Sequence, residues 1–107
     1  MKNVEQDIFN TIVKITSDIS DQDTSKKINI NTRISDVYNL LPLDSLDIVE
    51  VIIRLEKHYG ISIPDDKIQT EVKTFNNLCN LAAFCINQKK QENSLGYHIK
   101  QRFQKTK

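Results

Sequence analysis

Residues 44–65 read DSLDIVEVIIRLEKHYGISIPD and contain the clearest structural signals in the chain. Asp44 and Ser45 both belong to the residue types that accept a hydrogen bond from the free backbone amides of a helix's first turn. Asp47 adds a negative charge where the helix dipole favours one, and Gly60 suits the left-handed residue that closes a helix. The stretch therefore predicts a helix that begins at Asp44-Ser45 and ends at Gly60.

The predicted helix carries eight large apolar residues, more than one buried stripe on a surface helix requires. Helical spacing divides them into two lines. The first line, which we expect to face the core, consists of Ile48, Val51, Ile52, Leu55 and Tyr59. The second line is Leu46, Val49 and Ile53, and together with Glu50 and Glu56 it predicts an exposed docking strip for another protein. The alternative is a central helix that the bundle buries on all sides.

Apolar spacing predicts further helices on both sides of this one. Val4, Ile8, Ile12, Ile15 and Ile19 form the stripe of a first helix of about four turns. Residues 20–43 form a long connection that is apolar enough to pack against the core and to contain a short helical turn. Pro64 opens a short third helix near 65–70, and Thr74 caps a fourth helix from Phe75 to about Lys89. The predicted fold is an all-α four-helix bundle with a short third helix and a long first loop.

Length and charge predict one domain followed by a basic tail. A chain of 107 residues suffices for one modest core, which we assign to residues 1–87, with residues 88–107 as a C-terminal extension. Residues 36–71 hold eight acids against three bases, whereas residues 87–107 hold one acid against six bases. Leu95, Ile99 and Phe103 recur every four residues in the tail. The tail is therefore either a solvated extension or a basic amphipathic helix that forms at a surface.

The sequence offers little for an enzyme or a metal site. It has no nucleophile paired with a base, no metal-ligand cluster and no glycine-rich phosphate loop. Cys79 and Cys85 match no zinc or CxxC spacing, and His58 and His98 have no partner at metal-ligand or triad spacing. No apolar run suits a signal peptide or a membrane span, so we expect a cytoplasmic protein, and the six cations of the tail predict no specific nucleic-acid binding.

Residues 36–86 resemble the acyl carrier protein family in three features. These are Asp44-Ser45-Leu46-Asp47, the following Val49-Glu50 with its apolar run, and Gly60-Ile61-Ser62-Ile63-Pro64-Asp65. In that family an Asp-Ser-Leu motif opens the second helix, and an Ile-Pro-Asp turn follows it. The resemblance extends weakly to the first helix, while residues 87–107 go beyond the usual end of the family domain.

The resemblance implies that Ser45 receives 4′-phosphopantetheine from coenzyme A through a separate, magnesium-dependent phosphopantetheinyl transferase. Asp44 would help to bind the metal ion of that transferase. A phosphodiester at Ser45 would also lie against the free amides and the positive dipole of a helix start. Cargo would be held as a thioester on the arm, so the chain would be a carrier and not a catalyst; we also expect it to be a monomer. Its partners would be acyl-loading, elongating or transferring enzymes, and the family positions that such enzymes read match Leu46, Val49, Glu50, Ile53 and Glu56.

Two departures from the family pattern bear on the pathway. Pro42 stands three residues before the serine, where the family usually has glycine. Arg54 and Lys57 lie inside the recognition helix, and the net charge is +1, whereas carriers of fatty acid synthesis are strongly acidic. A specialised lipid or polyketide pathway therefore fits at least as well as fatty acid biosynthesis. The alternatives are an aminoacyl or peptidyl carrier with the same arm, and an unmodified helical adaptor in which Ser45 is a plain N-cap.

Overall fold

The structure is a computed structural model that describes residues 4–89. Its labelled helices are α1 (Val4–Ser20), α2 (Ile34–Leu40), α3 (Ser45–Tyr59) and α4 (Asp65–Glu71), and residues 75–89 form a further helix. Within the described part the only extended pairing is an isolated antiparallel bridge between Arg33 and Thr74. The prediction of an all-α bundle with a short helix after residue 64 is confirmed.

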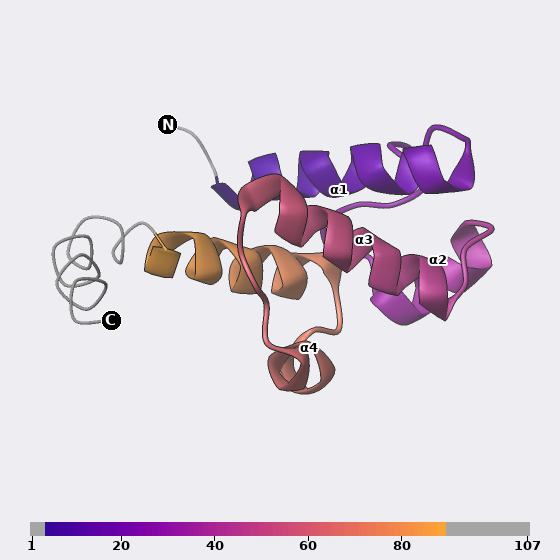
Figure 1. Cartoon of the computed structure of the whole chain (residues 1–107). Helices are drawn as coiled ribbons and strands as arrows, with labels where there is room; N and C mark the ends of the chain where they lie inside the picture. The colour runs from indigo at the N-terminus through magenta and orange to yellow at the C-terminus, as the bar shows by residue number, and fades with distance from the viewer. Residues whose placement is uncertain (1–3, 90–107) are drawn as a thin grey trace, which may run out of the picture.

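The longer helices enclose one core. Figure 1 shows α1 beside α3, with the helix of residues 75–89 below them and α4 turned so that it is seen nearly end-on. Ile8 and Ile12 of α1 and Leu55 of α3 are completely buried. Phe75, at the start of the last helix, packs against Phe9, and the centroids of the two rings are 5.8 Å apart. Burial of these side chains supplies the main driving force for the fold.

The long connection after α1 packs against the core, as predicted. A buried hydroxyl pair holds its first part to α1, because Thr24 Oγ1 lies 2.8 Å from Thr16 Oγ1. Ile28 is also buried. The expected helical turn is α2, which spans seven residues and buries Val37. The described residues thus contain one helix more than the four-helix prediction, because this loop buries Val37 by coiling.

The second part of the connection pairs with the start of the last helix. The amides of Phe75 and Asn76 donate to the carbonyl oxygens of Thr32 and Ile30, at 3.1 and 2.7 Å. The predicted cap by Thr74 is confirmed, since its hydroxyl accepts from the Asn77 amide at 3.2 Å. These bonds give partners to helix-start amides that would otherwise lack them.

The predicted C-terminal extension lies almost wholly outside the described residues. This holds for Leu95, Ile99 and Phe103 and for His98, so the division at residue 87 and the tail hypotheses stay predictions. Over residues 4–89, no helix has the length and apolar character that a membrane crossing needs.

Candidate functional site

The start of α3 is organised by its two aspartates and not by the serine between them. The Asp47 amide donates to Asp44 Oδ1 at 2.9 Å, and the Asp44 amide donates to Asp47 Oδ2 at 3.0 Å. This reciprocal pair is a capping box, and it makes Asp44 the N-cap of the helix. The sequence had left Asp44 and Ser45 as equal candidates for this position.

Ser45 is the first helical residue, and its side chain is exposed. Its hydroxyl makes no hydrogen bond to any residue between 4 and 89. The amides of Ser45 and Leu46 belong to the first turn, where no helical carbonyl is within reach. A hydroxyl in this position is accessible to an incoming reagent, and a phosphate bound to it would meet two free amides and the positive end of the helix dipole.

The segment before α3 is anchored on both sides of Pro42. Leu41 and Leu43 are buried, and the Leu43 amide donates to the Leu41 carbonyl at 2.8 Å. Pro42 lies between them and is exposed, in a turn that requires no amide donor from it. The departure from glycine at this position is thus accommodated, and the turn holds the start of α3 firmly against the core.

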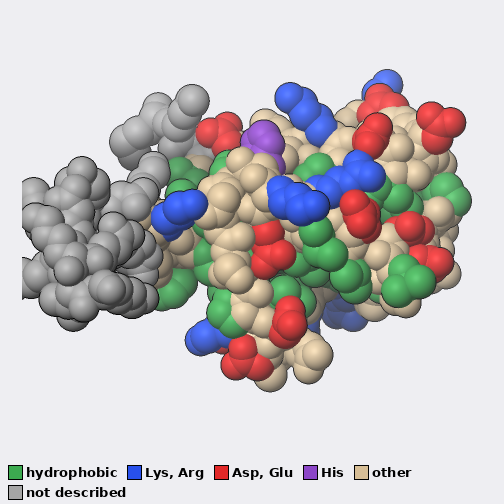
Figure 2. All heavy atoms as spheres, in the orientation of Figure 1, with side chains coloured by type: hydrophobic (Ala, Val, Ile, Leu, Met, Phe, Trp, Pro, Cys, Tyr) green, Lys and Arg blue, Asp and Glu red, His purple; other side chains and the backbone are tan. Residues whose placement is uncertain are grey.

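The second apolar line of α3 faces solvent, as predicted. Leu46, Val49 and Ile53 are 76%, 51% and 38% exposed, whereas Val51 and Leu55 are buried. Figure 2 shows hydrophobic side chains at the surface over α3 with acidic and basic ones among them. This exposed line, which we call the docking strip, excludes a helix that is buried all round.

The two glutamates expected beside the docking strip already have partners within the chain. Arg54 donates to Glu50 Oε2 through Nε at 2.8 Å and to Asp18 Oδ2 through Nη1 at 2.6 Å. The bond to Glu50, and to a smaller extent the bond to Asp18, raises the pKa of Arg54. Glu56 Oε2 accepts from the Ile63 amide at 2.7 Å and so fixes the loop that follows Gly60. Gly60 has a φ of 64°, the left-handed conformation expected of the residue that ends the helix.

An apolar cavity of about 70 Å³ lies against α3, lined there by residues outside the docking strip. Its walls come from four helices and from the segment after α4: Ile34, Ile48, Val51, Ile52, Ile68, Val72, Phe75 and Leu78. Ile48 and Ile52 follow Ser45 at intervals of three and seven residues, so the three share one side of α3. The sequence predicted that Ile48, Val51 and Ile52 face the core, but it contained no signal for an unfilled space beside them.

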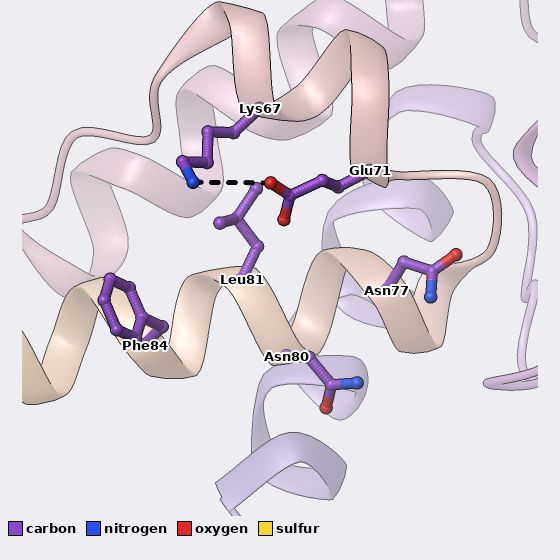
Figure 3. A pocket seen from close by; sticks show the side chains of 6 residues that line it. All are labelled: Lys67, Glu71, Asn77, Asn80, Leu81 and Phe84. Atoms are coloured by element: carbon purple, nitrogen blue, oxygen red, sulfur yellow. Dashed lines mark ion pairs between the residues drawn. The ribbon is translucent and has the colours of Figure 1, made fainter.

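A more open hollow lies between α4 and the last helix, where Figure 3 shows the residues that line it. Leu81 and the exposed Phe84 form its apolar part, and the Lys67–Glu71 ion pair, at 3.4 Å, borders it. Asn77 and Asn80 complete the lining. We assign this hollow no function.

Within residues 4–89 the two cysteines are poor nucleophiles. Burial raises the pKa of the Cys79 thiol to about 12, and burial also raises the pKa of Cys85. Both thiols are therefore protonated, and weakly nucleophilic, at neutral pH. His58 is exposed and packs edge-on against the Tyr59 ring. Residues 4–89 contain no group of three or more His, Cys, Asp or Glu side chains placed to hold a metal ion.

Comparison with known proteins agrees with this geometry. Residues 26–82 match the family described as "Phosphopantetheine attachment site". The chain is 39% identical over 70 residues to an acyl carrier protein of Lactobacillus acidophilus, which covers 65% of this chain and 81% of the relative. It is 44% identical over 52 residues to an acyl carrier protein of Porphyromonas gingivalis, which covers 45% of this chain and 65% of the relative. No solved structure gives a significant match.

The family match and the relatives together imply a covalently attached 4′-phosphopantetheine group. The exposed and unengaged hydroxyl at the start of α3 is chemically suited to such a group. The matched region contains α2, α3, α4 and the first part of the last helix. The chain therefore belongs to the acyl carrier protein family and contains its phosphopantetheine attachment domain.

Proposed function

We propose that Ser45 is the attachment residue and that the chain carries acyl intermediates in fatty acid, specialised lipid or polyketide biosynthesis. One observation carries the assignment of the residue: Asp44 performs the capping, so the exposed Ser45 hydroxyl is left without a structural task. This weakens the adaptor alternative, in which Ser45 would be a plain N-cap. The role of carrier and not catalyst agrees with the names of the relatives.

The chemistry at Ser45 is a single phosphoryl transfer. Ser45 Oγ attacks the pyrophosphate phosphorus of coenzyme A that bears the pantetheine, adenosine 3′,5′-bisphosphate leaves, and the hydroxyl proton passes to a base of the transferase. Asp44 uses only Oδ1 for the cap, so its exposed Oδ2 is available to the magnesium ion of the transferase. Once attached, the arm supplies the thiol on which cargo is held as a thioester.

The cavity favours an acyl over an aminoacyl cargo. All eight residues of its lining are apolar, and two of them lie on the side of α3 that carries Ser45. A hydrocarbon chain gains free energy by leaving water for such a space, whereas an ammonium group would lose its hydration without a partner. We therefore rank the aminoacyl or peptidyl carrier second.

The docking strip is our candidate for the surface that the transferase and acyl-handling enzymes contact. The strip presents the exposed apolar side chains of Leu46, Val49 and Ile53 close to Ser45, the proposed attachment residue. Glu50 and Glu56 occupy the other family positions, but each is held by an intramolecular partner. We expect the three apolar residues to contribute most of the binding free energy and the glutamates to contribute less.

The test of the attachment residue is a mass measurement. Apo protein incubated with coenzyme A, magnesium and a broad-specificity phosphopantetheinyl transferase should gain one phosphopantetheine group. Ser45→Ala should fold normally and gain none, and Ser62→Ala, which removes another exposed serine, should be modified like wild type. If wild-type protein gains no mass with transferases that modify other carriers, the proposal is wrong and the adaptor alternative is favoured.

A further inference from the structure

A positively charged cleft of about 660 Å³ lies beside the apolar cavity. It is formed by the start of α2 and by the segment that joins α4 to the last helix, with the lining Arg33, Ile34, Ser35, Val72, Lys73, Thr74 and Asn77. Ile34 and Val72 also line the apolar cavity. The linings of the cavity and the cleft therefore share these two side chains, so the two spaces are neighbours.

The neutral polar groups of the cleft are mostly occupied. The Ile34 amide donates to the Lys73 carbonyl at 2.9 Å, and Asn77 Oδ1 accepts from the amides of Lys73 and Thr74, both at 3.0 Å. These bonds and the bridge between Arg33 and Thr74 hold the two walls of the cleft together. The cleft is thus a fixed feature of the fold, and a ligand would meet side chains there and not backbone amides.

Among residues 4–89 the two cations of the cleft form no ion pair. Neither Arg33 nor Lys73 is among the ion pairs that residues 4–89 form, which join Arg54 to Asp18 and Glu50 and join Lys67 to Glu71. The nearest acids in sequence, Asp36 and Glu71, do not line the cleft, and Glu71 already faces Lys67. Two like charges in one cleft repel each other, and an anion placed between them would relieve that repulsion.

We propose that this carrier holds an acyl group whose far end is a carboxylate, with the hydrocarbon part in the apolar cavity and the carboxylate at Arg33 and Lys73. This inference rests on the proposed attachment at Ser45. Ile48 and Ile52 bring one wall of the cavity to the side of α3 that carries Ser45, and Ile34 and Val72 form the wall next to the cations. Cargo that enters along α3 therefore ends beside the cleft.

The size of the cavity restricts the cargo to a short chain. A volume of about 70 Å³ corresponds to roughly two groups the size of a water molecule, at about 30 Å³ each. A chain of a few methylene groups thus fills the cavity, and its terminal atoms emerge at the cleft. A methyl end would gain nothing from Arg33 and Lys73, whereas a carboxylate would accept charge-assisted hydrogen bonds from both.

Two cargoes of equal length test the inference. Apo protein is loaded by the transferase with the six-carbon hexanoyl group or the six-carbon adipyl group, from the corresponding coenzyme A thioesters, and complete loading is checked by mass. The adipyl form should melt about 4 °C or more above the hexanoyl form at low ionic strength. The difference should shrink in 0.5 M salt, because the charges lie at an open cleft.

Arg33→Gln and Lys73→Gln should each reduce the adipyl advantage, and the double variant should abolish it. Lys14→Gln on α1 removes an exposed charge away from the cleft lining and should leave the advantage intact. The rate at which hydroxylamine releases the cargo gives a second measurement: adipyl should be released more slowly than hexanoyl from wild type only. Both cleft side chains are exposed and make no hydrogen bonds within residues 4–89, so these variants should fold.

Three results would overturn the inference. One is equal melting of the adipyl and hexanoyl forms, and another is an adipyl advantage that survives the double substitution. The third is an equal loss of stability in the hexanoyl form of the variants, which would mean that the cations meet the phosphate of the arm. Failure to load at Ser45 would instead contradict the proposed attachment, so the two hypotheses fail by different observations.

Discussion

Replacing Asp44 by alanine removes the acceptor of the Asp47 amide at the start of α3 while leaving Ser45 in place. The hydrogen bond that is lost runs from the Asp47 amide to Asp44 Oδ1 and is 2.9 Å long. The other bond of the capping box, from the backbone amide of residue 44 to Asp47 Oδ2, does not need the Asp44 side chain. Loss of an N-cap aspartate costs about 1 kcal/mol of the free energy of unfolding. In a domain of this size that corresponds to a fall in melting temperature of about 4–8 °C. Ser45 caps nothing, so Ser45→Ala should change the free energy of unfolding by less than about half a kcal/mol.

Asp44→Asn separates the structural role of this residue from its chemical role. Asparagine caps helices about as well as aspartate, so this variant should melt close to wild type. It lacks the negative charge that would bind magnesium, so its rate of modification by the transferase should fall as far as that of Asp44→Ala. The assay combines thermal melting by circular dichroism with the initial rate of mass gain for all three variants.

The reasoning about the cap is wrong if Asp44→Ala melts like wild type while Ser45→Ala does not. That pattern would mean that the serine hydroxyl, and not the aspartate, satisfies the first turn of α3. It would also restore the interpretation of Ser45 as a plain cap. Equal modification rates for Asp44→Asn and wild type would remove the proposed metal contact without affecting the attachment itself.

Three further predictions follow from burial. Val49→Asp on the docking strip should leave melting nearly unchanged and slow modification, whereas Leu55→Asp should unfold the protein, because it buries an unpaired charge; equal collapse of both would show that no strip exists. Thr24→Val removes a buried hydroxyl that binds Thr16 and should cost about 1–3 kcal/mol in denaturant unfolding; an unchanged midpoint would contradict this. Burial raises the pKa of the Cys79 thiol from 9.0, its value in the unfolded chain, to about 12 in the folded protein. Between these two pH values, only the unfolded thiol ionises. Its contribution should therefore lower stability as pH rises above 9.0, and a Cys79→Ala variant should lose that part of the pH dependence.

The boundaries of α3 could be predicted from the sequence because their signals are local. Gly60 adopts the left-handed conformation with a φ of 64°, which a residue without a Cβ reaches at least cost. The periodic spacing of apolar residues in α3 likewise separates Val51 and Leu55, which are buried, from Leu46 and Val49, which are exposed. Each of these properties depends on neighbours within one or two helical turns.

The cap at the start of α3 required the folded backbone. Asp44 and Ser45 are adjacent and of equal capping ability, and the choice between them depends on which residue has extended backbone angles. Asp44 has a φ of −113° and a ψ of −175°, so it lies outside the helix and its carboxylate faces the Asp47 amide. The hydrogen bond from the Ile63 amide to the Glu56 carboxylate also required the folded structure. It joins residues seven positions apart across a turn whose course the sequence does not specify.

The cavity and the cationic cleft depend on segments that are distant in the chain. Arg33 and Thr74 meet through a bridge across 41 positions of sequence, and Ile34 meets Val72 in the same place. Composition and periodicity show that Ile34 is apolar and that Lys73 is charged, because these are properties of single residues and their near neighbours. Which of them face one another follows only from the way α2 and the last helix pack, since that packing is set by the whole core and not by any local segment.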